Sequence, residues 1–299
     1  MGWNGSLSSS SAVGASITYY SDTSSEGAYS VSSFTAPKKG IYRFQLYGSG
    51  GTNATASGGQ GGNTVGYLLL EAGSTVYIGA GGTCSATFVS SASGGKLSAI
   101  AKANLYFVAG AGGAGGSGPT DVDTVNIQRG GNGGGTSGSS GTGGSGGGTQ
   151  TSGGAAGTDW RDGDYPSAGS YGTGGAGGAD HSQGIWCSGG RGGDGLYGGG
   201  GGTANAVTNS STGETGSYAF GGGGGSGYIY TSTLVVGNKT YTSTTSQGSG
   251  ASAGSNGYVV VTYYDRSEIP VIFNGTQIEK IIFNGVEIES LIFNGTKLF

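Results

Sequence analysis

Short blocks of alternating apolar and polar residues recur along the first 110 positions. In residues 41–47, IYRFQLY, Tyr42, Phe44 and Leu46 alternate with polar Arg43 and Gln45, the period of a strand with one buried face. Four further blocks rich in β-branched and aromatic residues are bounded by Gly, Pro or Ser, namely 16–22, 64–73, 74–82 and 103–110. No segment keeps a 3.6-residue period. The pattern therefore predicts an all-β fold.

Between about residues 110 and 227 the chain changes to long glycine-rich stretches. The most prominent cover 130–148, 172–180, 189–202 and 220–227. A collagen-like triple helix is excluded, because there is no strict every-third-glycine frame and almost no proline. A flexible linker is an alternative, since Gly/Ser-rich chains behave as random coils.

Strand-like blocks after this region favour an ordered structure over a linker. Residues 227–230, 234–237 and 257–264 need strand partners from the first region, and 257–264 has the pattern of the final strand of the scaffold. Polyglycine helices have about three residues per turn and no internal hydrogen bonds, so their buried amides must pair with neighbouring helices. Ordering glycine is entropically expensive. We therefore expect a packed, cooperative bundle of polyglycine helices.

Residues 271–299 form a separate repeat of ten-residue period: VIFNGTQIEK, IIFNGVEIES, LIFNGTKLF. Asn-Gly between apolar strand residues is a strong hairpin signal, and Pro270 marks the boundary. So small an apolar module must stack on something. We expect oligomerisation or docking through Ile272, Phe273, Ile282, Phe283, Ile292 and Phe293. The predicted organisation is an N-terminal segment (1–29), a glycine-rich β-sandwich domain (30–265) and a small C-terminal β-hairpin repeat (266–299).

Composition changes this picture little. Glycine accounts for 74 of 299 residues, but only 9% are charged and the net charge is −4, which argues against simple charge-driven disorder. The weak acidic balance gives no reason to expect nucleic acid as a partner. No stretch approaches a membrane span and no signal peptide is visible, so synthesis in the host cytoplasm is expected. Cys84 and Cys187 are expected to be free thiols rather than a disulfide.

The order of the β and glycine blocks resembles a known family. SFTAPKKGIYRFQLYGSGG, GGQGGNTVGYLLLEAGSTVYIGAGG, LSAIAKANLYFVAGAGGAGG, FGGGGGSGYI and NGYVVVTYY follow one another over roughly residues 30–264. This is similar to the glycine-rich domain of bacteriophage tail adhesins and bacterial surface proteins, which also occurs in anaplastic lymphoma kinase and the leukocyte tyrosine kinase receptor. Its most specific part is Phe34, Pro37, Gly40, Tyr42, Phe44, Leu46 and Gly48, followed by the glycine run and TVGYLLLEAGSTVYIGAGG.

The resemblance implies a jelly-roll-like β-sandwich with polyglycine helices packed in a near-hexagonal array. The C-terminal repeats resemble the ends of tail proteins in phages of Gram-positive, gut-type bacteria, so the phage branch of the family is the nearer one. The chain departs from long fibres in lacking heptads or other shaft repeats. That leaves open whether it is a whole fibre or a tip.

Catalytic chemistry has few candidates. His181 is the only histidine, and Cys187 lies six residues away within a glycine-rich segment. Carboxylates at 159, 162 and 164 lack the EF-hand spacing and its distal Glu. We expect no enzyme activity, no cofactor and no metal, with a carboxylate pair for glycoside cleavage as the open alternative.

Binding is the stronger expectation. Segments 120–129, 158–172, 180–187 and 205–220 differ in composition from the glycine stretches and would be loops on a rigid platform, where recognition usually occurs. We expect exposure for Trp160 and Tyr165, whereas Trp186 is equally compatible with packing beneath the loops. The candidate receptor-binding residues are Trp160, Arg161, Asp164, Tyr165, Tyr171, Asp180, His181 and Trp186.

These observations predict a phage tail-tip adhesin that presents loops from a polyglycine scaffold to a bacterial surface receptor, protein or glycan. Its location would be the virion tail. Other tail proteins would be partners, and the chain would form a homo-oligomer, with a trimer as one option. One alternative is a structural tail component that acts as a rigid spacer. Another is a bacterial cell-surface adhesin.

Overall fold

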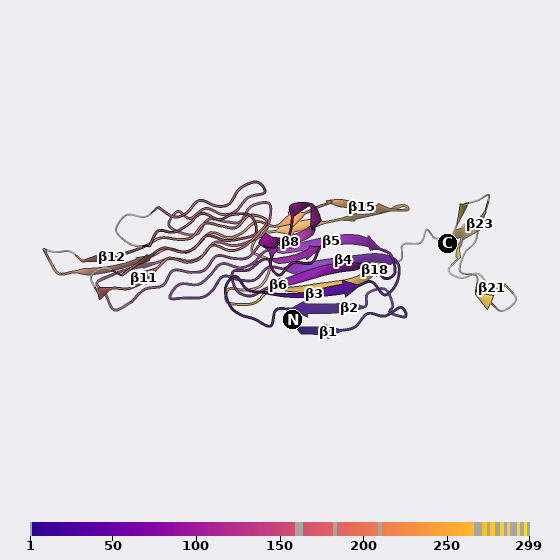
Figure 1. The fold of residues 1–299 in the computed structure, drawn as a ribbon, viewed down its shortest axis with the longest axis horizontal. Helices are drawn as coiled ribbons and strands as arrows, with labels where there is room; N and C mark the ends of the chain where they lie inside the picture. Colours follow the sequence, from indigo (N-terminus) through magenta and orange to yellow (C-terminus); the bar gives the residue numbers. More distant parts are fainter. Residues whose placement is uncertain are drawn as a thin grey trace.

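The protein is all-β, as the alternation predicts (Figure 1). The computed structural model describes residues 2–158, 164–181, 184–208, 211–265, 271–273, 276–278, 282–283, 286–287, 292–293 and 296–297. This part of the chain contains no α-helix, and its short 3₁₀ turns include η1 (Leu97–Ala99) and η2 (Lys102–Asn104). The predicted all-β class is therefore confirmed.

One face of a β-sandwich is a six-stranded antiparallel sheet. Its order is β1 (Gly2–Gly5), β2 (Ser16–Tyr20), β18 (Tyr258–Asp265), β4 (Gly40–Tyr47), β5 (Asn63–Leu70) and β17 (Thr244–Ser246). Strand β18, predicted as the final strand of the scaffold, lies between β2 and β4. The N-terminal segment expected to precede the domain instead contributes β1 and β2 to this sheet, because Tyr19 and Ile17 pair with Val259 and Val261.

The opposite face is a five-stranded antiparallel sheet. Its order is β14 (Tyr228–Ile229), β8 (Leu105–Ala109), β7 (Thr87–Ser90), β6 (Thr75–Gly81) and β3 (Tyr29–Thr35). A separate hairpin of β15 (Thr233–Val236) and β16 (Lys239–Thr242) follows β14. Strands β3 and β7 were not predicted, because serine and threonine break their apolar pattern.

The core of the sandwich lies between these sheets. Tyr42, Phe44 and Leu46 are fully buried, as their alternation predicts. They pack against residues of the other sheet such as Phe107 and Ile78, and the ring centroids of Phe44 and Phe107 are 6.2 Å apart. Burial of large apolar side chains therefore holds the two sheets together.

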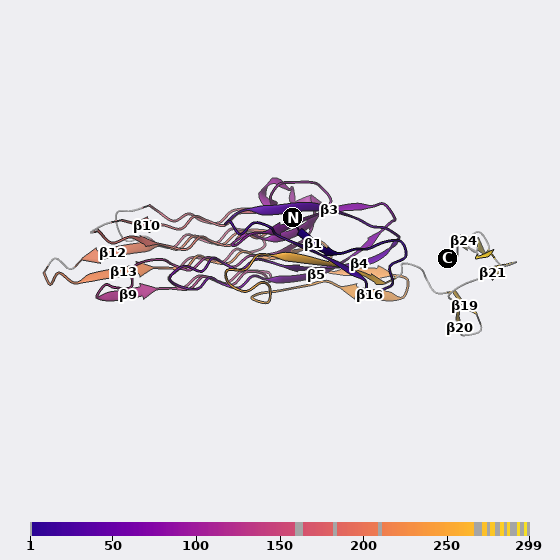
Figure 2. The same ribbon diagram turned by 90° about the horizontal axis from the view of Figure 1, so that it is seen from below.

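A glycine-rich arm extends from one end of the sandwich (Figures 1 and 2). Most of it is the connection between β8 and β14, residues 110–227, so the chain leaves and re-enters the sandwich on two strands that pair with each other. The connection between β4 and β5, residues 48–62, adds further segments. Long extended segments run side by side along the arm in both views.

Segment 111–117 illustrates how the arm is bonded. The N–H groups of its first, fourth and seventh residues donate to carbonyl oxygens of segment 188–194, each at 2.8 Å. Its second and fifth residues donate to residues 49–52 at 3.0 and 3.1 Å, and its third and sixth to residues 128–131 at 2.9 and 3.0 Å. Every third residue thus returns to the same neighbour.

Such close contact between backbones requires glycine at the inner positions. A Cβ atom added to Gly113 would lie 2.1 Å from the carbonyl oxygen of Gly222, and one added to Gly199 would lie 2.1 Å from that of Gly223. These separations are far below van der Waals contact. Glycine is therefore used in the arm for its lack of a side chain.

Short strands gather at the end of the arm opposite the sandwich (Figures 1 and 2). We call this end the tip. Its three-stranded sheet has the order β12 (Ala204–Thr208), β13 (Thr215–Ala219) and β9 (Thr124–Ile127), with β13 antiparallel to β12 and parallel to β9. A two-stranded ladder, β10 (Ala179–Asp180) and β11 (Cys187–Ser188), packs beside it.

The ten-residue repeat forms three hairpins, which confirms the Asn-Gly signal. They are β19 (Val271–Phe273) with β20 (Thr276–Ile278), β21 (Ile282–Phe283) with β22 (Val286–Glu287), and β23 (Ile292–Phe293) with β24 (Thr296–Lys297). In each, the innermost paired residues flank one Asn-Gly in the sequence. The oligomerisation role of Ile272, Phe273, Ile282, Phe283, Ile292 and Phe293 stays a prediction, since their side chains lie outside the described part of the structure.

Candidate functional site

Three neighbouring segments at the tip carry predicted site residues. The Asp164 N–H donates to the Ala179 carbonyl at 2.8 Å, and the return bond is 3.0 Å. In the next ladder, Asp180 pairs with Cys187. Because Tyr165, His181 and Trp186 each adjoin one of these paired residues, adjacent segments bring them to the same end of the arm.

The aromatic side chains of these segments face solvent. Tyr165 is 74% exposed and Trp186 is 70% exposed. The His181 ring meets Trp186 edge-to-face, with the ring centroids 4.5 Å apart and an interplanar angle of 65°. This contact orients the indole while leaving most of its surface free. We call Tyr165, His181 and Trp186 the tip aromatic group.

A small core beneath this group fixes the direction of Trp186. Its neighbours Ile185 and Cys187 are buried and pack with Ala204 and Ala206. The alternation of buried, exposed and buried side chains over residues 185–187 is strand-like, so the indole points outward. That alternation was readable in the sequence and resolves the open question about Trp186.

The Asp180 side chain stabilises the fold and is not exposed. Its side chain is buried, and Oδ2 accepts a 2.8 Å hydrogen bond from the Ala206 N–H. The carboxylate therefore ties β10 to β12 beneath the tip. The expectation that Asp180 contacts a receptor directly does not fit this burial.

Tyr171 lies at the sandwich end of the arm, away from the tip aromatic group. Its hydroxyl donates to the Ile100 carbonyl at 2.6 Å, and its ring packs edge-to-face on Tyr197 with centroids 5.8 Å apart. Tyr171 thus seals the junction of arm and sandwich, and its expected receptor contact does not fit that position. Asp164 is exposed at the tip, whereas Trp160 and Arg161 lie outside the described residues.

The three-stranded tip sheet carries a row of polar residues that was not predicted from the sequence. Tyr218 of β13 lies between Asn205 of β12 and Asn126 of β9 in register. All three are half-buried, whereas Ala206 and Ser217 on the other face are buried. The Asn205 amide oxygen is buried and has no hydrogen-bond partner among the described residues, so the Asn126 amide and the Tyr218 phenol are the groups of this row that can donate and accept hydrogen bonds with a polar ligand. The alternation in ANAVT and TGSYA is weak, which is why these strands went unpredicted.

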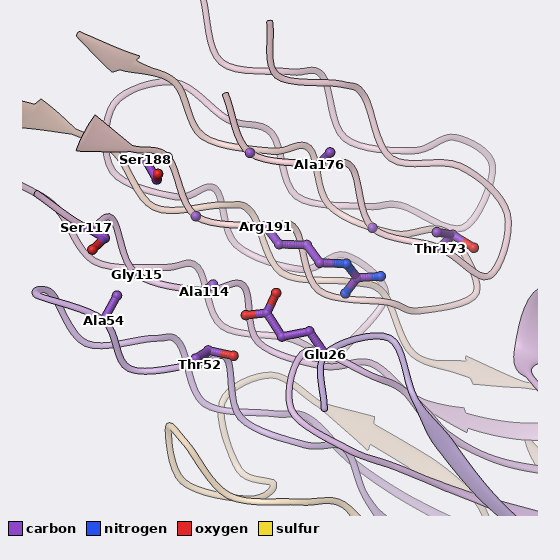
Figure 3. A pocket seen from close by; sticks show the side chains of 14 residues that line it. Glu26, Thr52, Ala54, Ala114, Gly115, Ser117, Thr173, Ala176, Ser188 and Arg191 are labelled. Atoms are coloured by element: carbon purple, nitrogen blue, oxygen red, sulfur yellow. The ribbon is translucent and has the colours of Figure 1, made fainter. Parts of the chain in front are cut away.

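A concave feature lies along the side of the arm near the sandwich (Figure 3). We call it the side trough. It has a volume of about 450 Å³ and is walled by segments 52–54, 114–117, 173–177 and 188–191. Most of its lining is Gly, Ala, Ser or Thr. Glu26, from the loop between β2 and β3, and Arg191 are the charged residues that line it.

An ion pair within the arm, between Arg191 and the buried Asp194, is hydrogen-bonded to the sandwich beside this trough. Asp194 Oδ1 accepts hydrogen bonds from Arg191 Nη2 at 2.6 Å and from the Gly174 N–H at 2.8 Å, while Oδ2 accepts one from the Tyr29 hydroxyl at 2.6 Å. Burial and then the Asp194 charge raise the pKa of Tyr29 well above its usual value. Tyr29 therefore stays protonated as the donor from β3.

Both cysteines are free and buried. Cys84 has a backbone φ of +59°, and its thiol lies 3.8 Å from Glu26 Oε1. Burial, followed by the Glu26 charge, raises the pKa of the Cys84 thiol to about 11. The Cys187 sulfur lies 3.2 Å from Ser217 Oγ inside the tip core. Neither position offers an accessible thiolate nucleophile.

Searches for relatives give no assignment: no protein-family model matches the chain, and no curated protein matches its sequence. Among the described residues, no group of three or more His, Cys, Asp or Glu side chains is placed to hold a metal ion. The described residues also contain no helix long and apolar enough to cross a membrane.

Proposed function

We propose that the chain is a phage tail-tip adhesin, a receptor-binding protein of the virion that attaches to a bacterial surface protein or glycan. The observation that carries the proposal is the tip aromatic group. Two large aromatic side chains, each at least 70% exposed, stand with His181 at the far end of a rigid arm. Exposed Trp and Tyr are costly to leave in solvent and are frequent anchors of recognition sites.

The proposed scaffold is a polyglycine-helix bundle on a jelly-roll-like sandwich. The three-neighbour bonding of segment 111–117 supports the first part, because a helix with about three residues per turn directs successive peptide groups in three directions. Two packed antiparallel sheets support the second. A bundle bonded on every side would hold the tip segments with little freedom, which favours binding by lowering its entropic cost.

Binding rather than catalysis suits the chemistry of the tip. His181 packs on Trp186, the Cys187 thiol is buried, and the Asp180 carboxylate is used beneath the surface. The proposed partners are the receptor at the tip and other tail proteins. Self-association would use the apolar C-terminal hairpins.

The experiment that tests this proposal measures attachment of the fluorescently labelled protein to a panel of bacterial cells and to their fractionated envelopes. Replacing Tyr165, His181 and Trp186 together by Ala should reduce attachment by more than tenfold, since a hot-spot residue contributes about 2 kcal/mol or more. Trp3→Ala is the matched control, because Trp3 is 62% exposed but lies on β1 of the sandwich. Equal attachment by both variants and the unaltered protein would reject the tip as the receptor site.

The two alternatives make different predictions. A structural spacer should keep virion attachment when Tyr165, His181 and Trp186 are replaced together by Ala. A bacterial cell-surface adhesin should be found on cells and not in purified virions. Detection of the chain in virions together with loss of attachment in that triple variant would leave the phage adhesin.

A further inference from the structure

The inner segments of the arm are surrounded on all sides by other segments. Residues 221–225 form backbone hydrogen bonds with residues in segments 110–117, 129–134, 138–148, 189–195 and 198–202. Each of those neighbours is glycine-rich and approaches to backbone contact, as the Gly222 and Gly223 carbonyls show. The packing unit of the arm is thus one extended segment held by several neighbours that lie alongside it.

The side trough has the walls of such a packing position and no segment inside it. Segments 114–117 and 188–191 form its floor, bonded to each other through Ser117 and Ser188 at 2.8 Å. Segments 52–54 and 173–177 flank the floor on its two sides (Figure 3). A further extended segment laid in the trough would therefore touch four segments, much as the inner segments do.

One peptide N–H on each of two walls has no acceptor. The Ser188 N–H donates to Ser117, whereas the N–H of Arg191, three residues further on, has no acceptor among the described residues. On the opposite flank the Gly174 N–H is bonded to Asp194, and the N–H of Gly177 has no acceptor within the described residues either. The carbonyl groups of an extended chain without internal hydrogen bonds are free to accept from both.

The lining also selects what could enter. The lining includes no aromatic side chain on which a sugar or base could stack. Apart from Glu26 and Arg191, no side chain in the lining is larger than threonine. Glu26 stands in the trough as an exposed carboxylate. It can accept peptide N–H groups, as the Asp194 carboxylate accepts that of Gly174 at 2.8 Å. A chain with side chains on every face could not come close enough to use these groups.

From these observations we infer that the side trough binds an extended glycine-rich segment of a partner protein, which occupies it as one more segment of the arm. Its backbone accepts hydrogen bonds from Gly177 and Arg191 and donates to Glu26. This site is separate from the tip and does not depend on receptor binding there. It assigns to the arm a second role, in docking a glycine-rich tail of another protein.

The test uses the full chain and a synthetic peptide of about twelve residues, roughly four turns, with the sequence pattern Gly-Gly-Ser and blocked ends. Amide hydrogen exchange of the protein is followed by NMR with and without excess peptide. The peptide should slow exchange of the Gly177 and Arg191 N–H groups by about tenfold or more, because both become bonded. A peptide of the same length with Val at every second position should have no effect.

Variants that fill the trough give the complementary evidence. Ser188→Trp and Ala54→Trp place an indole on exposed positions of the trough lining, and both should abolish the peptide effect. Ala155→Trp is the matched control, since Ala155 is an exposed alanine of the arm outside that lining. Unchanged exchange at Gly177 and Arg191 with the glycine peptide in the unaltered protein overturns the inference, and so does an equal effect of the valine peptide. A response to neutral oligosaccharides but not to the peptide would also overturn it.

Discussion

The sandwich and the glycine-rich arm bury their backbones by opposite means. In the sandwich, Tyr42, Phe44 and Leu46 fill the space between two sheets, and removing a side chain would open a cavity. In the arm, the space between segments is already filled by backbone, and a Cβ at Gly199 would lie 2.1 Å from a carbonyl oxygen. The stability of the sandwich is therefore sensitive to the removal of side-chain atoms, and that of the arm to their addition.

This contrast has an energetic side. Burial of apolar surface stabilises the sandwich at roughly 25 cal/mol per Å², whereas glycine offers little such surface. The arm depends on many hydrogen bonds, each with a net contribution of about 1 kcal/mol, against the high entropy of free glycine. It should fold only as a whole and only when attached to a structure that aligns its segments.

The largest effect is expected at the joint between the two regions. Asp194→Asn leaves Arg191 buried without its anion and weakens the bond from Tyr29, so the free energy of unfolding should fall by about 3–5 kcal/mol. Urea denaturation measures it. Glu71→Gln serves as the control, because Glu71 pairs with Lys39 on the surface, where the loss should stay below about 1 kcal/mol. Similar losses in the two variants would mean that the joint does not couple arm and sandwich.

The next effect tests the arm alone. Gly199→Ala should lower the free energy of unfolding by about 3 kcal/mol or more, since the added methyl group forces segments apart. Gly95→Ala is matched to it, because a Cβ at Gly95 meets nothing within 4 Å. Thermal scanning of both proteins should show a large shift for the first and almost none for the second. A neutral Gly199→Ala would contradict backbone-to-backbone packing of the arm.

A smaller effect is expected from alkaline pH. Because folding raises the pKa of Cys84 to about 11 from an ordinary value near 8.5, its contribution to stability is complete below about pH 8 and is lost as pH rises towards about 11. The loss should total roughly 3 kcal/mol. Cys84→Ala, which keeps a side chain at the same φ, should show a correspondingly shallower decline in denaturation experiments from neutral to alkaline pH. Identical pH profiles would show that the thiol does not ionise on unfolding.

The smallest effect concerns the tip. Trp186→Ala should change the free energy of unfolding by less than about 0.5 kcal/mol, as is usual for exposed positions, because the indole packs mainly on His181. Ile185→Ala, at a buried neighbouring position, should cost about 2 kcal/mol or more. If Trp186→Ala were as damaging as Ile185→Ala, the indole would be part of the fold rather than of a binding surface.

The alternation of apolar and polar residues predicted strongly apolar strands that pair with each other, such as β4 and β18. It did not predict β3, β12 or β13, where small and hydroxylated residues make up the strand. Pairing with the distant β6 and β9 defines β3 and β13, and β12 is defined by its hairpin with β13. The same limit applies at the tip. Trp186 could be placed from Ile185 and Cys187 on either side, but Asp180 could not, because its partner Ala206 is remote in sequence. Tyr171 was misplaced for the same reason, since Ile100 and Tyr197 hold it.

The chain enters the arm from β8 and leaves it into β14, and these two strands pair through Val108 and Tyr228. The strands are antiparallel neighbours at the edge of the five-stranded sheet, so the arm is attached at the same end of both. A force that pulls the tip away from the sandwich therefore acts along both strands at once. It shears the hydrogen-bond ladders that join these strands to their neighbours. Hydrogen bonds loaded in this way share the force instead of opening one after another. The route of the chain makes the sandwich a mechanical anchor for whatever the tip holds.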